Sequence, residues 1–172
     1  MNELYHHSIK GQKWRVKNRP PYPLNAVVNL SKHMKTFKYS DFTTLKDHDW
    51  VAKNKKGSCH DQVMYELYEL RKCGLNPEAD FFIQVDNNGQ GYQTHSFVHY
   101  EQNGRRVWFE NAWEDERGIH VYNSYNDMKN DIEEKINAPK GIHILWGKFD
   151  DSKVKPGDDL QTVVDKCLDL ED

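Results

Sequence analysis

Two runs of alternating apolar and polar residues, joined by an Asn-Gly pair, constrain this chain more than any other feature. Residues 94–100 and 106–113 flank Asn103-Gly104. Asn-Gly between two such runs is typical of a type I′ turn, which joins antiparallel strands. We therefore predict a β-hairpin with Asn103 and Gly104 as its loop.

A two-residue loop also fixes which side chains share a face of the hairpin. The register that follows pairs Gln102 with Arg105, His99 with Trp108, and Phe97 with Glu110. One face then carries His95, His99 and Glu110, with the backbone of Glu110 roughly 7–8 Å diagonally from that of either histidine, within side-chain reach. The pattern does not choose between the two histidines. A three-residue loop would shift the parity and present Asn111 in place of Glu110.

A cysteine begins the helix that we expect next to this hairpin. Cys59 follows a small-residue loop, and apolar residues continue from it at helical spacing (Val63, Leu67 and Leu70). The helix should end near Gly74, which suits a left-handed cap. Free N–H groups and the helix dipole at its first turn favour a thiolate, the nucleophilic form of cysteine. The alternative is a buried structural cysteine.

Composition limits the classes of function. The chain has 172 residues, a net charge of −3, 37% hydrophobic residues and 12% aromatic residues. This length and composition fit one globular domain, and the charge gives no strong field to attract nucleic acid or an anionic membrane. No apolar run resembles a signal peptide or a membrane span. We expect a cytoplasmic protein.

The cysteines do not suggest a disulfide framework or a metal site. Cys59, Cys73 and Cys167 are an odd number without CxxC spacing. Cys59, His60 and Asp61 cannot converge on one ion, because they are consecutive residues of a helix. We expect His60 and Asp61 to point elsewhere, in structural or modulatory roles. With no phosphate-cradling glycine loop either, neither a metal nor a cofactor is expected.

The remaining elements complete an α+β pattern. Residues 1–22 are proline-interrupted and non-periodic, so we expect a flexible N-terminal arm before a single domain over residues 23–172. Further helices are predicted at 24–37, at 124–137 with Ser124 as the cap, and at 160–168. Further strands are predicted at 81–85, 118–122 and 142–149.

The order of cysteine, histidine and acid along these elements resembles the transglutaminase-like cysteine enzymes of the papain-like group. Cys59 matches the family's nucleophile, His95 its base and Glu110 its third member. The resemblance implies an N-terminal helical part and a catalytic helix packed on an antiparallel sheet. It covers about residues 50–150. The chain departs from the family in its acid, which is more usually Asp, and in His60, which replaces an aromatic residue after the cysteine.

The resemblance implies attack of the Cys59 sulfur on an amide carbonyl, with His95 moving the proton and Glu110 orienting the imidazole. The backbone N–H of Cys59 is a natural oxyanion donor, and Trp50 and Asn111 are the candidates for further oxyanion or substrate contacts. A protein or peptide substrate is expected. Hydrolysis and acyl transfer to an amine share one thioester intermediate and stay open.

A short N-terminal motif bears on origin. Residues 5–15, YHHSIKGQKWR, resemble the YHHGxKGQKWG opening of many bacteriophage and prophage proteins of Gram-positive hosts, with Ser8 and Arg15 replacing two glycines. This resemblance suggests a phage- or prophage-encoded protein acting in a bacterial host. It also keeps a second hypothesis open, in which the chain is a catalytically inactive phage interaction module that retains the fold.

Overall fold

A computed structural model describes residues 24–169, and the expected arm at residues 1–22 lies outside them. The described chain is mixed α+β. Its helices are α2 (Leu24–Met34), α3 (His48–Asn54), α4 (Cys59–Lys72), α5 (Tyr125–Ile136) and α6 (Leu160–Cys167), with a 3-10 turn η1 at Glu114–Glu116. Its strands are β1 (Lys38–Tyr39), β2 (Lys56–Gly57), β3 (Glu78–Asp86), β4 (Gly91–Gln102), β5 (Arg105–Glu110), β6 (Gly118–Tyr122) and β7 (Ile142–Lys148).

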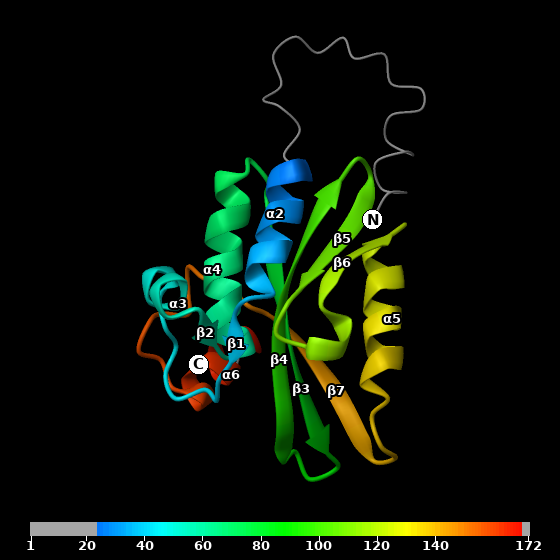
Figure 1. Cartoon of the computed structure of the whole chain (residues 1–172). Coiled ribbons are helices and arrows are strands. Elements are labelled where there is room, and N and C mark those ends of the chain that lie inside the picture. Colours follow the sequence, from blue (N-terminus) through cyan, green and yellow to red (C-terminus); the bar gives the residue numbers. More distant parts are fainter. Residues whose placement is uncertain (1–23, 170–172) are drawn as a thin grey trace.

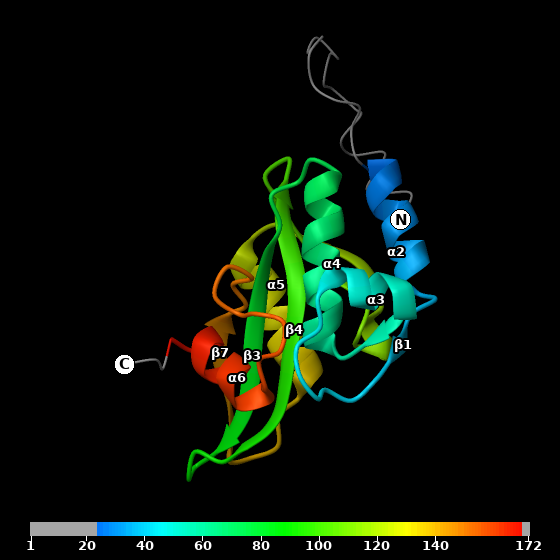
Figure 2. The ribbon, with the colours of Figure 1, turned by 90° about the vertical axis from the view of Figure 1, so that its left-hand side faces the viewer.

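The main sheet has five antiparallel strands in the order β6-β5-β4-β3-β7. Helices cover both of its faces. Figures 1 and 2 show α2, α3 and α4 on one side of the sheet and α5 on the other. The expected packing of the cysteine-bearing helix on an antiparallel sheet is therefore present.

Each face of the sheet has its own apolar core. The α4 side includes side chains from both sheet and helices, among them Phe81, Val98, Phe109, Leu67 and Leu70. The α5 side is smaller and joins sheet residues to α5 (Phe82, Phe97, Trp108, Met128 and Ile132). Side chains alternate between the two faces along β4, so the neighbours Phe97 and Val98 enter opposite cores.

The predicted hairpin is confirmed. Gln102 pairs with Arg105 and His99 with Trp108, and both loop residues have positive φ, 53° at Asn103 and 74° at Gly104. A type I′ turn requires positive φ at both positions. The second strand is shorter than expected, because β5 ends at Glu110.

Helix α4 begins at Cys59 and ends before Gly74, as predicted. Gly74 has a φ of +80°, which is the left-handed conformation expected after a helix. The first predicted helix is shorter than its apolar pattern, since α2 ends at Met34 rather than at residue 37. Ser124 caps α5 by accepting a hydrogen bond from the Asp127 N–H at 3.1 Å.

Candidate active site

The start of α4 is fixed by a reciprocal cap. The Ser58 side chain accepts from the Asp61 N–H at 3.3 Å, while the Asp61 carboxylate accepts from the Ser58 N–H at 2.9 Å. The other oxygen of Asp61 accepts from the Lys46 N–H at 2.8 Å. Gly57 is required by close approach, because a Cβ there would lie 2.7 Å from the Cβ of Asp61. Together these contacts hold Cys59 in the first turn, where its N–H has no partner within the helix.

His95 and Glu110 meet on the sheet as the predicted register requires. The Nε2 of His95 lies 2.9 Å from Oε2 of Glu110. The imidazole also interacts with the Cys59 sulfur, and each of the two groups shifts the pKa of the other. All three side chains are buried, with exposures of 4% for Cys59, 8% for His95 and 3% for Glu110.

The Glu110 carboxylate is held by several donors besides His95. Its Oε2 also accepts from the indole N–H of Trp108 at 3.2 Å, and its Oε1 accepts from the backbone N–H groups of Asn111 and Trp113, both at 2.9 Å. The Trp113 ring packs edge-on against the His95 ring, with centroids 5.9 Å apart. The carboxylate is thus fixed in position before any substrate binds, and it fixes the imidazole in turn.

The electrostatics of this group favour a thiolate–imidazolium pair. Burial by itself raises the pKa of Cys59, but interactions first with His60 and then with His95 outweigh burial and lower the pKa to about 5. Burial lowers the pKa of His95, but the charge of Glu110 and the hydrogen bonds with Cys59 and Glu110 raise it to about 10. The sulfur is therefore a thiolate at neutral pH, which is the attacking form.

His60 does not point away from the site as expected. Its ring is buried against β4, with Nδ1 2.8 Å from the Ser96 hydroxyl and Nε2 3.1 Å from the Thr94 hydroxyl, and it also contacts the Cys59 sulfur. Both of its ring nitrogens are occupied by hydroxyl groups. His95, which has a carboxylate partner, is therefore the better proton carrier, and His60 acts on the thiolate electrostatically.

The structure chooses between the two strand histidines. Glu110 binds His95, while His99 lies in a separate buried cluster with its Nε2 3.2 Å from Oδ2 of Asp80 and its Nδ1 3.0 Å from Arg106. Asp80 also accepts from the hydroxyl of Tyr125 at 2.7 Å. His99 therefore belongs to an ion-pair cluster that joins strands β3, β4 and β5 to α5.

The two further candidates from the sequence have other partners in the structure. Asn111 points to α4, where its side-chain amide donates to Gln62 at 2.6 Å, so it does not replace Glu110 beside His95. Trp50 lies half-buried in α3, with the ammonium groups of Lys46 and Lys56 5.7 and 6.0 Å from its ring centroid. A contact of Trp50 with substrate therefore stays a prediction.

Sequence reasoning missed two residues of the site. The hydroxyl of Tyr39 lies close enough to Cys59 for the two groups to interact, although Tyr39 lies 20 positions earlier, on β1. Glu66 follows Cys59 on α4 and is 2% exposed, close enough to Glu110, His95 and Cys59 for their charges to act on it. The i, i+7 spacing of Cys59 and Glu66 was a usable signal for Glu66. No local pattern marks Tyr39.

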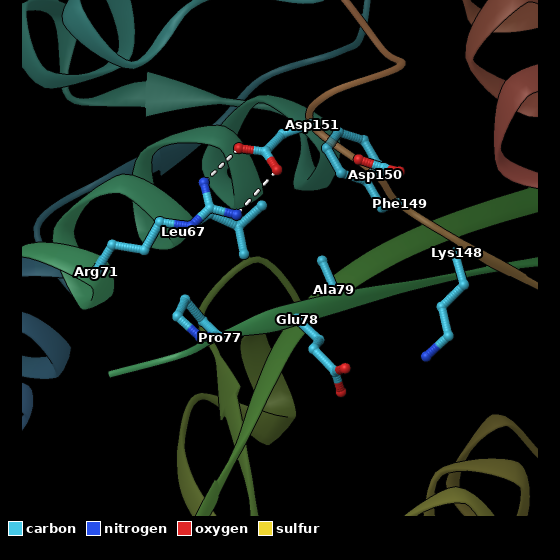
Figure 3. A pocket seen from close by; sticks show the side chains of 9 residues that line it. All are labelled: Leu67, Arg71, Pro77, Glu78, Ala79, Lys148, Phe149, Asp150 and Asp151. Carbon is cyan, nitrogen blue, oxygen red and sulfur yellow. Dashed lines mark hydrogen bonds and ion pairs between the residues drawn. The ribbon is translucent and has the colours of Figure 1, made fainter. Parts of the chain in front are cut away.

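A pocket of about 290 Å³ lies elsewhere, at the other end of α4. Figure 3 shows the residues that line it, among them Ala79, Glu78 and Lys148, and the ion pair between Arg71 and Asp151. Glu78 and Lys148 are paired with Arg106 and Asp80, respectively. Arg71, Asp151, Glu78 and Lys148 are thus paired within the chain, and Cys59 is not among the residues that line the pocket.

Within residues 24–169, no group of three or more His, Cys, Asp or Glu side chains is arranged to hold a metal ion. Nor does any helix in that range have the length and apolarity needed to cross a membrane. No protein-family model matches the chain, and no curated protein matches it. A function is therefore inferred from the residues of the site.

Proposed function

We propose that this protein is a cysteine enzyme that acts on an amide carbonyl through Cys59, His95 and Glu110. The observation that carries the proposal is the 2.9 Å hydrogen bond between the imidazole of His95 and the carboxylate of Glu110, beside a thiol at the buried N-terminus of α4 whose pKa that imidazole lowers. A papain- or transglutaminase-like arrangement is part of the proposal. It is supported by the order of the three residues and by the packing of α4 on an antiparallel sheet.

In the proposed reaction the Cys59 thiolate attacks the carbonyl carbon, and the carbonyl π electrons move to the oxygen. As the tetrahedral intermediate collapses, the C–N bond breaks and the leaving nitrogen takes the proton of the His95 imidazolium. A thioester on Cys59 remains. His95, now neutral, then removes a proton from water or from an amine, which attacks the thioester and releases the thiolate.

Glu110 holds the imidazole in the required orientation and stabilises its positive charge, as the third member of such triads does. Water as the second nucleophile gives hydrolysis, and an amine gives acyl transfer. For the substrate we propose only the chemical class, an amide in a peptide, an isopeptide or a glutamine side chain.

The experiment uses two small reagents on the full chain. Iodoacetamide labelling followed by peptide mass spectrometry should modify Cys59 selectively near pH 7, and p-nitrophenyl acetate should acetylate it with release of p-nitrophenolate. Cys59→Ala should abolish both reactions at this position, and His95→Ala should slow both. Equal, slow labelling of Cys59, Cys73 and Cys167 would contradict the proposal.

Adding hydroxylamine to the p-nitrophenyl acetate reaction separates the two outcomes of the thioester. Formation of acetohydroxamate in excess of the Cys59→Ala background would indicate acyl transfer. Acetate alone, at a rate unaffected by the amine, would indicate hydrolysis.

A further inference from the structure

Tyr39 is held beside the nucleophile by a short parallel ribbon. β1 pairs with β2, with Tyr39 opposite Gly57, and β2 leads directly into Ser58 and Cys59. Backbone hydrogen bonds on both sides of Tyr39 secure the ribbon, from the Lys38 N–H to the Lys55 carbonyl at 3.0 Å and from the Ser40 N–H to the Gly57 carbonyl at 3.2 Å. The position of Tyr39 is therefore tied to the loop that begins α4.

The hydroxyl of Tyr39 is available as a donor. Tyr39 lies opposite Gly57 and close enough to Cys59 for its hydroxyl and the sulfur to interact, and the residue is 53% exposed, so it also borders solvent. Burial, followed by the negative charges of Cys59, Asp41 and Asp61, raises the pKa of Tyr39 to about 12. At neutral pH the group keeps its proton and can donate it only as a hydrogen bond.

We propose that Tyr39 is a further catalytic residue, whose hydroxyl donates to the oxyanion that forms when Cys59 attacks a carbonyl. This inference rests on the proposed function. In the tetrahedral intermediate the oxyanion is bonded to the same carbon as the sulfur, so a donor close enough to interact with the sulfur needs only a small shift to reach the oxygen. The Cys59 N–H at the start of α4 supplies the first donor, and Tyr39 supplies the second.

With p-nitrophenyl acetate the step is an acyl transfer to sulfur. The thiolate forms the S–C bond, the carbonyl oxygen becomes an oxyanion held by the Cys59 N–H and the Tyr39 O–H, and collapse expels p-nitrophenolate. Iodoacetamide reacts at the same sulfur by displacement of iodide at an sp³ carbon and forms no oxyanion. The pair of reagents therefore separates a donor to the oxyanion from a donor to the resting thiolate.

The test compares Tyr39→Phe with the wild-type chain at pH 8, where Cys59 is a thiolate. Acetylation by p-nitrophenyl acetate should slow by about 10²-fold or more, the effect of removing one oxyanion donor. Alkylation by iodoacetamide should not slow, because the thiolate is still formed. Tyr92→Phe is the matched control. The hydroxyl of Tyr92 also donates a hydrogen bond, to the carboxylate of Asp86, but Tyr92 lies on the exposed start of β4.

Equal slowing of both reactions by Tyr39→Phe would reduce Tyr39 to a partner of the thiolate and overturn the proposal, as would slowing of neither. A failure of the proposed function looks different, because wild-type Cys59 would then react no faster than Cys73 with either reagent. If Tyr39→Phe lowers the melting temperature, Tyr39→Gln offers another donor, and partial recovery of acetylation over Tyr39→Phe is expected. No recovery in a folded Tyr39→Gln chain would count against the donor role.

Discussion

Glu110 and His95 lie 2.9 Å apart through Oε2 and Nε2, and the carboxylate is held on its other side by two backbone N–H groups. Glu110→Gln keeps the size of the side chain but removes the charge that favours the imidazolium. We expect a folded protein whose acetylation by p-nitrophenyl acetate falls by about 10²- to 10⁴-fold. The measurement is the burst rate of p-nitrophenolate.

Glu101→Gln is the control for Glu110→Gln, because Glu101 is an exposed residue near the end of β4, and its rate should match the wild type. A wild-type rate in Glu110→Gln itself would remove the carboxylate from the mechanism.

The pH dependence of labelling follows from the pKa values of the pair. The pKa of Cys59 is lowered to about 5, so the thiolate is lost only as the pH falls through about 5. The pKa of His95 is raised to about 10, so the imidazolium needed by a leaving amine is lost as the pH rises through about 10. We expect iodoacetamide labelling of Cys59 to rise near pH 5 and amide turnover to form a bell between these limits.

The other two thiols provide an internal control in the same sample. Burial and nearby acids raise the pKa of Cys73, and raise that of Cys167 to about 12. Both should therefore label appreciably only in alkaline solution. Labelling of all three cysteines with one pH midpoint would show that Cys59 is not activated.

Glu66 is predicted to be a neutral acid beneath the site. Burial, followed by the negative charge of Glu110, raises its pKa well above the usual value, and its Oε1 is buried without a hydrogen-bond partner among the described residues. A raised carboxyl pKa means that folding opposes ionisation, so wild-type stability should fall as the pH rises above the ordinary glutamate pKa. Glu66→Gln should remove this loss. The melting temperature of Glu66→Gln should therefore rise relative to that of the wild type as the pH rises.

Glu69→Gln serves as the control for Glu66→Gln, since Glu69 lies on the same helix in an exposed pair with Lys72. Its melting temperature should follow the wild type at every pH to within the small effect of a surface ion pair. Parallel curves for the wild type and Glu66→Gln would mean that Glu66 is charged.

The cluster around Asp80 is expected to stabilise the fold. Asp80 is 1% exposed and accepts from Tyr125 and, at 2.8 Å, from Lys148. Asp80→Ala would leave His99 buried opposite no charge, and loss of one partner of a buried pair typically lowers the free energy of unfolding by about 3–5 kcal/mol. Urea unfolding measures this loss, and Glu78→Gln, at the exposed edge of the cluster, should lower it far less.

The cluster also has a pH signature. Burial raises the pKa of Asp80, but hydrogen bonding and charge interaction with His99, and hydrogen bonds from Lys148 and Tyr125, lower it to about 2. A depressed carboxyl pKa stabilises the fold above the ordinary value of 3.8, and this contribution is lost as the pH falls toward 2. In Asp80→Asn the decrease in stability over this range should be smaller.

The hairpin and the helix start were predictable because both depend on local chemistry. Asn103-Gly104 determines the turn, the turn determines the register, and the register places Glu110 beside His95. In the same way Cys59 is placed by a small-residue loop and by the apolar spacing of α4. The hairpin could thus be assigned the histidine and the carboxylate of the site, and α4 its cysteine.

Contacts between distant segments were not predictable. Nothing local to Lys38 and Tyr39 indicates that they pair with Lys56 and Gly57, and so the approach of Tyr39 to the sulfur was missed. His60 was assigned away from the site because consecutive helix residues diverge. The orientation of its ring depends on hydrogen bonds with Ser96 and Thr94 of β4, and the sequence pattern of the helix does not reveal these partners.

Cys59 and His60 touch neighbouring residues of β4, the first His95 and the second Ser96 and Thr94. Since neighbouring strand residues face opposite ways, sliding this strand by one position would offer the sulfur a hydroxyl instead of an imidazole. The hydrogen bonds of His60 resist such sliding. His60, next to the nucleophile, thus helps to keep His95 aligned with the sulfur. An insertion or deletion within β4 should therefore abolish the reaction even in a chain that still folds.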